Sequence, residues 1–221
     1  MPNWCENYLR LEVPNKEEAD KLVAVLDNSG DEDSVGLLGY LVPEPNYDNQ
    51  EFKEQSAMFP DWYEWRVHNW GTKWDVDVQD WNKVDNSDGT CTFDMNFDSA
   101  WSPPTGVYDS VAQKENWKVF ATFIEGGCAF LGYFEDNNAY QYDCDKRDTT
   151  DAPSWLVDDY AWYYDQLDEW EQEEDVENIN AGTMTEDQFL VKWGVDTYNI
   201  YKESMNPNTD EPEKKDWSTD A

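Results

Sequence analysis

Apolar and polar residues alternate along several short segments of the chain, as they do in β-strands that bury one face. In residues 4–13, for example, Leu9, Leu11 and Val13 are apolar, whereas the positions between them are polar. Gly126-Gly127 separates two further segments of this kind, as the turn of a hairpin would. The predicted strands are residues 4–13, 91–97, 117–125 and 128–135.

Helical spacing of apolar residues follows the first strand, with Asn15 as the expected N-cap and Leu22 and Leu26 on the apolar face. A second short helix is predicted at Val107–Lys114. Residues 31–85 are predicted to be a long insert that contains one short element, Leu37–Leu41. This order predicts an α+β fold, a ferredoxin-like antiparallel sheet with helices on one face.

The last third of the chain has a different pattern. Residues 156–172 have apolar residues at helical spacing, and a second helix is expected from Thr185 to about Lys202, with Thr183 or Thr185 as its cap. We therefore predict a ferredoxin-like domain over residues 1–148, an acidic helical extension over 149–204 and a disordered tail over 205–221.

Composition narrows the possible functions. The chain has 221 residues, 50 Asp and Glu against 15 Lys and Arg, and a formal net charge of -35. Binding to a phosphate backbone depends on Lys and Arg, so direct nucleic-acid binding is not expected. The 13 Trp and 13 Tyr residues indicate a folded core. No apolar run is long enough to span a membrane and no secretion signal opens the chain, so no membrane partner is expected.

The residue types do not indicate a zinc site or a catalytic centre. The four cysteines, Cys5, Cys91, Cys128 and Cys144, form no closely spaced pair, and the chain has a single histidine, His68. We therefore assign no catalytic residue, metal or cofactor.

Three motifs of uncommon residues occur in order: Met1–Asn7 (MPNWCEN), Trp70–Asp75 (WGTKWD) and Phe97–Pro104 (FDSAWSPP). In sequence and spacing they resemble the YubB-like proteins of bacteriophages and plasmids, a family with an Api-type ferredoxin-like domain. The resemblance covers about residues 1–135 and implies a ferredoxin-like fold and an origin on a mobile element, but no activity. The motif residues are Trp4, Trp70, Gly71, Thr72, Lys73, Trp74, Asp75, Trp101, Ser102, Pro103 and Pro104.

The aromatic segment that contains the second motif has two interpretations. Its rings, including Trp62, Tyr63 and Trp65, either pin the insert to the sheet or form a stacking platform. The surrounding acids favour the structural interpretation. Asp94 and Asp98, together with Asp75 or Asp77, are candidates for a carboxylate site for a hard cation, although no calcium-loop motif occurs.

The strongest functional lead is the acidic run that begins at residue 158, because no Lys or Arg lies between Arg147 and Lys192. Like charges at this density oppose helix formation. Such a run is compatible with solubility in high salt, with a solvated face that binds nothing, or with a surface that imitates nucleic acid. The candidate partner-binding residues are Asp158, Asp159, Asp165, Asp168, Glu169, Glu173, Glu174 and Asp175.

These observations favour a non-enzymatic, phage-type accessory protein in the cytoplasm of a bacterial host. Its expected partner is a basic host protein that handles nucleic acid, which it would block by DNA mimicry in host takeover or anti-defence. The alternatives are a metal-dependent module built on carboxylates and a structural protein of virion assembly. The oligomeric state and the identity of the partner stay open.

Overall fold

The computed structural model describes residues 3–29, 34–47, 61–144 and 151–205 of the chain. The contacts within the chain divide it into two compact units, Met1–Ala161 and Trp162–Ala221. The residues of the predicted tail from 206 onward lie outside the described residues.

The first unit is built on a sheet that, in the described residues, has the strand order β2-β3-β1-β4-β5-β6. Its central strand β1 pairs antiparallel with β3 on one side and with β4 on the other. With α1 (Lys16–Leu26) directly after β1 and α5 (Thr105–Ala112) directly after β3, the order β2-β3-β1-β4 is the ferredoxin-like arrangement. The predicted fold class is therefore confirmed. The strands are β1 (Trp4–Val13), β2 (Val78–Asp85), β3 (Cys91–Ala100), β4 (Lys118–Glu125), β5 (Phe130–Glu135) and β6 (Asn138–Asp143).

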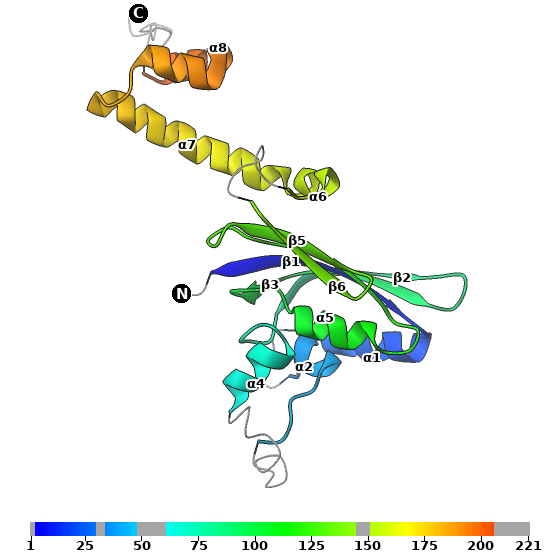
Figure 1. Ribbon diagram of the computed structural model, residues 1–221. Coiled ribbons are helices and arrows are strands. Elements are labelled where there is room, and N and C mark those ends of the chain that lie inside the picture. Colours follow the sequence, from blue (N-terminus) through cyan, green and yellow to red (C-terminus); the bar gives the residue numbers. More distant parts are fainter. Residues whose placement is uncertain (1–2, 30–33, 48–60, 145–150, 206–221) are drawn as a thin grey trace, which may run out of the picture. The chain divides into compact units, whose positions relative to one another are not determined.

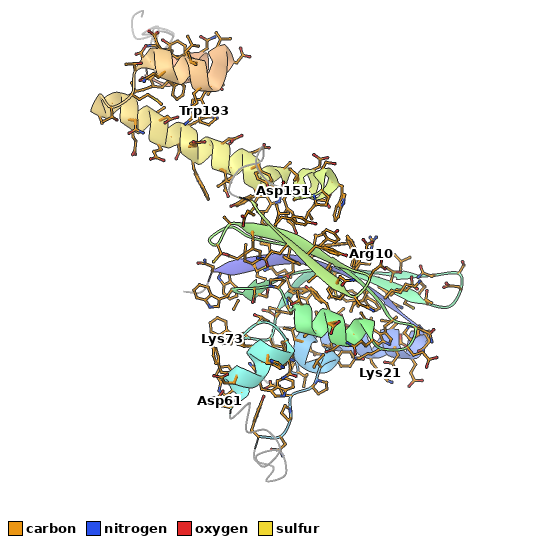
Figure 2. All side chains as sticks on the ribbon, in the orientation of Figure 1. Arg10, Lys21, Asp61, Lys73, Asp151 and Trp193 are labelled. Carbon is orange, nitrogen blue, oxygen red and sulfur yellow. The ribbon has the colours of Figure 1, made fainter. Side chains whose placement is uncertain are left out.

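Among the residues that the structure describes, four helices cover one face of this sheet: α1 (Lys16–Leu26), α2 (Leu37–Leu41), α4 (Trp62–Asn69) and α5 (Thr105–Ala112) (Figure 1). The predicted alternation in β1 is confirmed, since Leu9, Leu11 and Val13 are buried in the core under these helices. Each such side chain contributes about 1.5–3 kcal/mol through the apolar surface that it buries. Arg10, on the opposite face, points away from the helices (Figure 2).

Local sequence signals account for several helix boundaries. The side-chain oxygen of Asn15 accepts a hydrogen bond from the backbone N–H of Glu18, so the predicted N-cap of α1 is confirmed. Asp61 caps α4 in the same way through the backbone N–H of Glu64. The predicted element Leu37–Leu41 is the helix α2.

Strands β2 and β6 were not predicted. Residues 78–85 were assigned to the insert, but they pair with β3 and so belong to the sheet. β6 pairs with β5 and extends the sheet at its other edge. Both edge strands have few buried side chains, so their sequences lack the strong alternation that burial of one face imposes.

The predicted helix over residues 156–172 is interrupted. Helix α6 (Ser154–Asp159) ends at Tyr160, and α7 (Ala161–Ala181) starts directly afterwards. The Tyr160 hydroxyl donates to Thr122 Oγ1 of β4 at 3.1 Å, and the Trp155 ring packs against those of Phe120 and Tyr133. These contacts attach α6 to the sheet, so the first unit extends to Ala161 rather than ending at residue 148.

The second unit contains α7 and α8 (Glu186–Met205). Thr185 is the cap of α8, because its Oγ1 accepts from the backbone N–H of Gln188 while the Gln188 side chain accepts from the Thr185 N–H.

Helix α8 does not run straight. Glu186 Oε2 accepts from the Tyr198 hydroxyl at 2.8 Å and pairs with Lys202 at 2.5 Å. In a straight helix these partners would lie about 18–24 Å away along the axis. The backbone of Gly194, with φ 82° and ψ 173°, interrupts the helix. The segments on either side of Gly194 therefore fold back against each other.

Candidate acidic recognition surface

Helix α7 has an exceptional density of negative charge. Residues 165–177 contain eight Asp and Glu residues and no Lys or Arg. Thirteen helical residues rise about 20 Å, which corresponds to one negative charge in about 2.5 Å. Double-stranded DNA carries one charge in about 1.7 Å of its axis. The acids of α7 therefore reach about two-thirds of the linear charge density of a DNA duplex, before the pairing of Glu171 and Asp175 with Lys192 is subtracted.

The predicted partner-binding residues are distributed over two units. Asp158 and Asp159 are exposed on α6, which belongs to the first unit. Five others are exposed on α7 in the second unit: Asp165, Asp168, Glu169, Glu173 and Glu174. The structure therefore brings these five together on one helix.

Asp175 requires a correction, because it is buried rather than presented to a partner. Its Oδ2 accepts hydrogen bonds from Lys192 Nζ at 2.5 Å and from the Trp193 indole N–H at 2.9 Å. Figure 2 shows Trp193 between α7 and α8. Burial alone would raise the pKa of Asp175, but these two hydrogen bonds outweigh it, and the pKa is lowered. Asp175 thus connects α7 to α8.

Four acids on α7 form a row. Asp165, Glu169, Glu173 and Glu177 follow at intervals of four residues, with about 6 Å of helix axis between neighbours. Glu177 was not among the predicted partner-binding residues, although its spacing in the sequence identifies it. Asp168 lies about 60° from Asp165 around the helix, so exposed acids also occur beside the row.

An open groove of about 530 Å³ lies between α7 and α8. Glu169, Glu173 and Glu177 of the row line it, so its edge on α7 is acidic. The other residues that line it are Gln172, Val176, Phe189, Thr197, Ile200 and Tyr201. Sequence reasoning missed the groove because it depends on the reversal at Gly194, which brings Ile200 and Tyr201 back beside Phe189.

The three motif segments meet at one end of the sheet. The Asn7 side chain donates to Ser99 Oγ, and Thr72 Oγ1 donates to the carbonyl oxygen of Ala100. The Ser102 hydroxyl donates to the carbonyl oxygen of Gly71. The next two residues, Pro103 and Pro104, are buried. These bonds tie the first, second and third motifs together, which gives the motif residues a structural role.

The second motif has a buried and an exposed part. Trp70 is fully buried and donates its indole N–H to the carbonyl oxygen of Val42, while Asp75 accepts from the backbone N–H groups of Leu38 and Gly39 at the start of α2. These residues match the structural interpretation of the aromatic cluster.

Other aromatic residues of the motifs face solvent. Trp4 is 50 % exposed, and its ring lies 6.2 Å from that of Trp74. The ammonium group of Lys73 lies 4.5 Å from the ring centroid of Trp74. Trp101 is 49 % exposed. The exposed rings Trp4, Trp74 and Trp101 are called the tryptophan surface below.

The carboxylates Asp75, Asp94 and Asp98, which were considered for a cation, each bind other groups of the protein. Asp75 caps α2, Asp94 binds Arg10 and Tyr8, and Asp98 accepts from Gln79. Within the described ranges, no group of three or more His, Cys, Asp or Glu side chains is placed to hold a metal ion.

Comparison with known proteins adds no identification: no family model, no curated protein and no solved structure matches this chain. In the part of the chain that the structure describes, no helix is long and apolar enough to cross a membrane.

Proposed function

We propose that this protein is a non-enzymatic, phage-type accessory protein that captures a basic, nucleic-acid-handling protein of its bacterial host. The observation that carries the proposal is the charge of α7, whose acids reach about two-thirds of the linear charge density of duplex DNA. The surface would act in the host cytoplasm as a DNA mimic that occupies the nucleic-acid site of its target, in host takeover or anti-defence.

Electrostatics gives such a surface a definite mode of action. Complementary charge accelerates encounter and suppresses binding of acidic proteins. Lys192 pairs with Glu171 and Asp175 of α7, and neither of these two acids belongs to the exposed row. A basic partner would therefore relieve repulsion within α7 when it binds.

The test is retention of host proteins from a bacterial lysate on the immobilised full-length protein. A salt series from about 0.05 M to about 1 M covers the range in which the Debye length falls from above 10 Å to about 3 Å. We expect specific nucleic-acid-binding proteins to be retained at low salt and released as salt rises.

Two variants with the same change in net charge make the test specific. One replaces the exposed acids of α7, Asp165, Asp168, Glu169, Glu173 and Glu174, by Asn or Gln. The other replaces five exposed acids of the first unit in the same way: Asp27, Asp80, Asp109, Glu115 and Glu135. Loss of retention only in the first variant supports the proposal. Equal loss of retention in both variants would show that retention depends only on net charge. Unchanged retention in both variants would refute the proposal.

The tryptophan surface supports a second candidate function, a structural module of virion assembly. Trp101 has a backbone φ of 71°, a left-handed conformation that strains a bulky residue by about 1–2 kcal/mol. The Trp101 backbone N–H donates to the carbonyl oxygen of Asn3 at 3.0 Å, which fixes the backbone here, while about half of the residue stays exposed. Self-association measured by light scattering across a dilution series, and abolished by Trp4→Ala with Trp101→Ala, would favour this function. A monomer at every concentration, absent from purified particles, would exclude it.

A further inference from the structure

The groove between α7 and α8 combines two chemical properties that the charge of α7 alone does not require. Val176, Phe189, Ile200 and Tyr201 give it an apolar lining, and Ile200 is 69 % exposed there. An exposed isoleucine beside a row of carboxylates contributes little to the fold of the unit. It does, however, offer apolar area to a ligand.

The charge around this lining has a single sign. Glu169, Glu173 and Glu177 line the α7 side, and none of the residues that line the groove is Lys or Arg. The nearest base in sequence, Lys202, is paired with Glu186. An anionic or purely polar ligand is therefore disfavoured, whereas a ligand with an apolar face flanked by cations is complementary to both properties.

We propose that the groove seats an amphipathic basic helix of the partner, with its apolar side against Val176 and Ile200. This inference rests on the proposed function and specifies the element of the partner that is recognised. The glutamates of the row follow every four residues, about 6 Å along α7. Lys or Arg residues at the same interval on a helix beside α7 repeat at the same distance, so each glutamate can meet one cation.

This arrangement divides the affinity into two components. The contacts with the row weaken as salt rises, because exposed ion pairs are screened. The contacts with Val176 and Ile200 persist, because burial of apolar surface does not depend on charge. A mimic that used charge alone would have only the first component.

The experiment measures binding of three synthetic peptides to the full-length protein by fluorescence anisotropy at low and high salt. The first is a Leu- and Lys-containing peptide with amphipathic helical spacing, the second has the same composition in a scrambled order, and the third is oligolysine of equal charge. We expect the amphipathic peptide to bind about tenfold more tightly than the scrambled one, which corresponds to burial of about one apolar side chain.

Matched variants assign the effect to the groove. Ile200→Ser is expected to weaken the amphipathic peptide about tenfold at both salt concentrations. Val195→Ser, at an exposed position of the same half of α8 that does not line the groove, is expected to leave binding unchanged. The triple variant Glu169→Gln, Glu173→Gln, Glu177→Gln is expected to reduce the salt dependence more than the equally charged control Asp168→Asn, Glu174→Gln, Asp187→Asn.

The outcomes separate this inference from the proposed function. Equal binding of all three peptides, unaffected by Ile200→Ser, would overturn the groove inference and leave capture by charge intact. If no basic peptide bound, both proposals would fail. If Ile200→Ser instead converted a dimer into a monomer in light scattering, the occupant would be a second copy of the chain, which also overturns the inference.

Discussion

Replacement of Gly194 by alanine tests whether the reversal of α8 is encoded at a single residue. The φ and ψ angles of Gly194, 82° and 173°, lie in a region that is essentially restricted to glycine. Apart from its two chain neighbours and the nearby backbone of α8, no heavy atom lies within 4 Å of a Cβ atom added at Gly194. Any effect of Gly194→Ala must therefore come from the backbone and not from a steric clash with a neighbour.

The magnitude follows from two contributions. Holding alanine in this region costs about 1–3 kcal/mol. Alanine also favours a continuous helix by about 1 kcal/mol relative to glycine. The balance between the reversed and the straight helix thus shifts by about 2–4 kcal/mol towards the straight one. The contacts that oppose this shift are the bonds of Glu186 to Tyr198 and Lys202 and the packing of Phe189 on Tyr201.

Nuclear Overhauser effects between aromatic rings provide a direct assay. The ring centroids of Phe189 and Tyr201 lie 5.3 Å apart in the reversed helix, whereas twelve residues of straight helix separate them by about 18 Å. We expect the Phe189–Tyr201 signal to be lost or strongly weakened in Gly194→Ala, together with binding of the amphipathic peptide. Gly89→Ala is the control, since Gly89 also has a positive φ and open space but lies in the first unit. An unchanged signal and unchanged urea stability would refute the reasoning.

Three further predictions concern single side chains. Asp175→Asn should lower the stability of the second unit by about 2 kcal/mol at pH 7 through loss of a charged hydrogen-bond acceptor. The pKa of Asp175 is lower in the folded state than its unfolded value of 3.8. The stability difference between wild type and Asp175→Asn should therefore be complete above pH 3.8 and disappear as the pH falls through the lower, folded-state pKa. Urea unfolding at pH 7 and pH 3 measures this difference, and the same difference at both pH values would show that the bonds contribute nothing. Asp75→Ala should destabilise the first unit by about 1–2 kcal/mol, because the N–H groups at the start of α2 lose their acceptor. Calorimetry measures this loss, and Asp77→Ala, at an exposed position, is the control. Trp70→Ala should destabilise by about 3–5 kcal/mol and Trp74→Ala by less than about 1 kcal/mol; equal losses in thermal unfolding would contradict their different burial.

Prediction from sequence succeeded where local interactions or burial of one face determine structure. Asn15 identified the start of α1 because its side chain bonds three residues ahead, and the alternation of Leu9, Leu11 and Val13 identified β1 because the sheet buries one face. It failed for β2 and β6, which lie at the sheet edges with few buried side chains. It also failed to place the break at Tyr160, which coincides with a bond to Thr122, 38 residues earlier in the chain.

For the candidate site, the amino-acid sequence by itself determined the charge of α7 and its row of glutamates, because charge and helical spacing are properties of neighbouring residues. Only the tertiary structure decided that Asp175 is withdrawn into a bond with Lys192 and Trp193. It likewise decided that Ile200 lies beside the row, because that position depends on the reversal at Gly194 and on packing between residues distant in the chain. Long-range packing, which no local pattern specifies, thus turns an acidic helix into one side of an apolar groove.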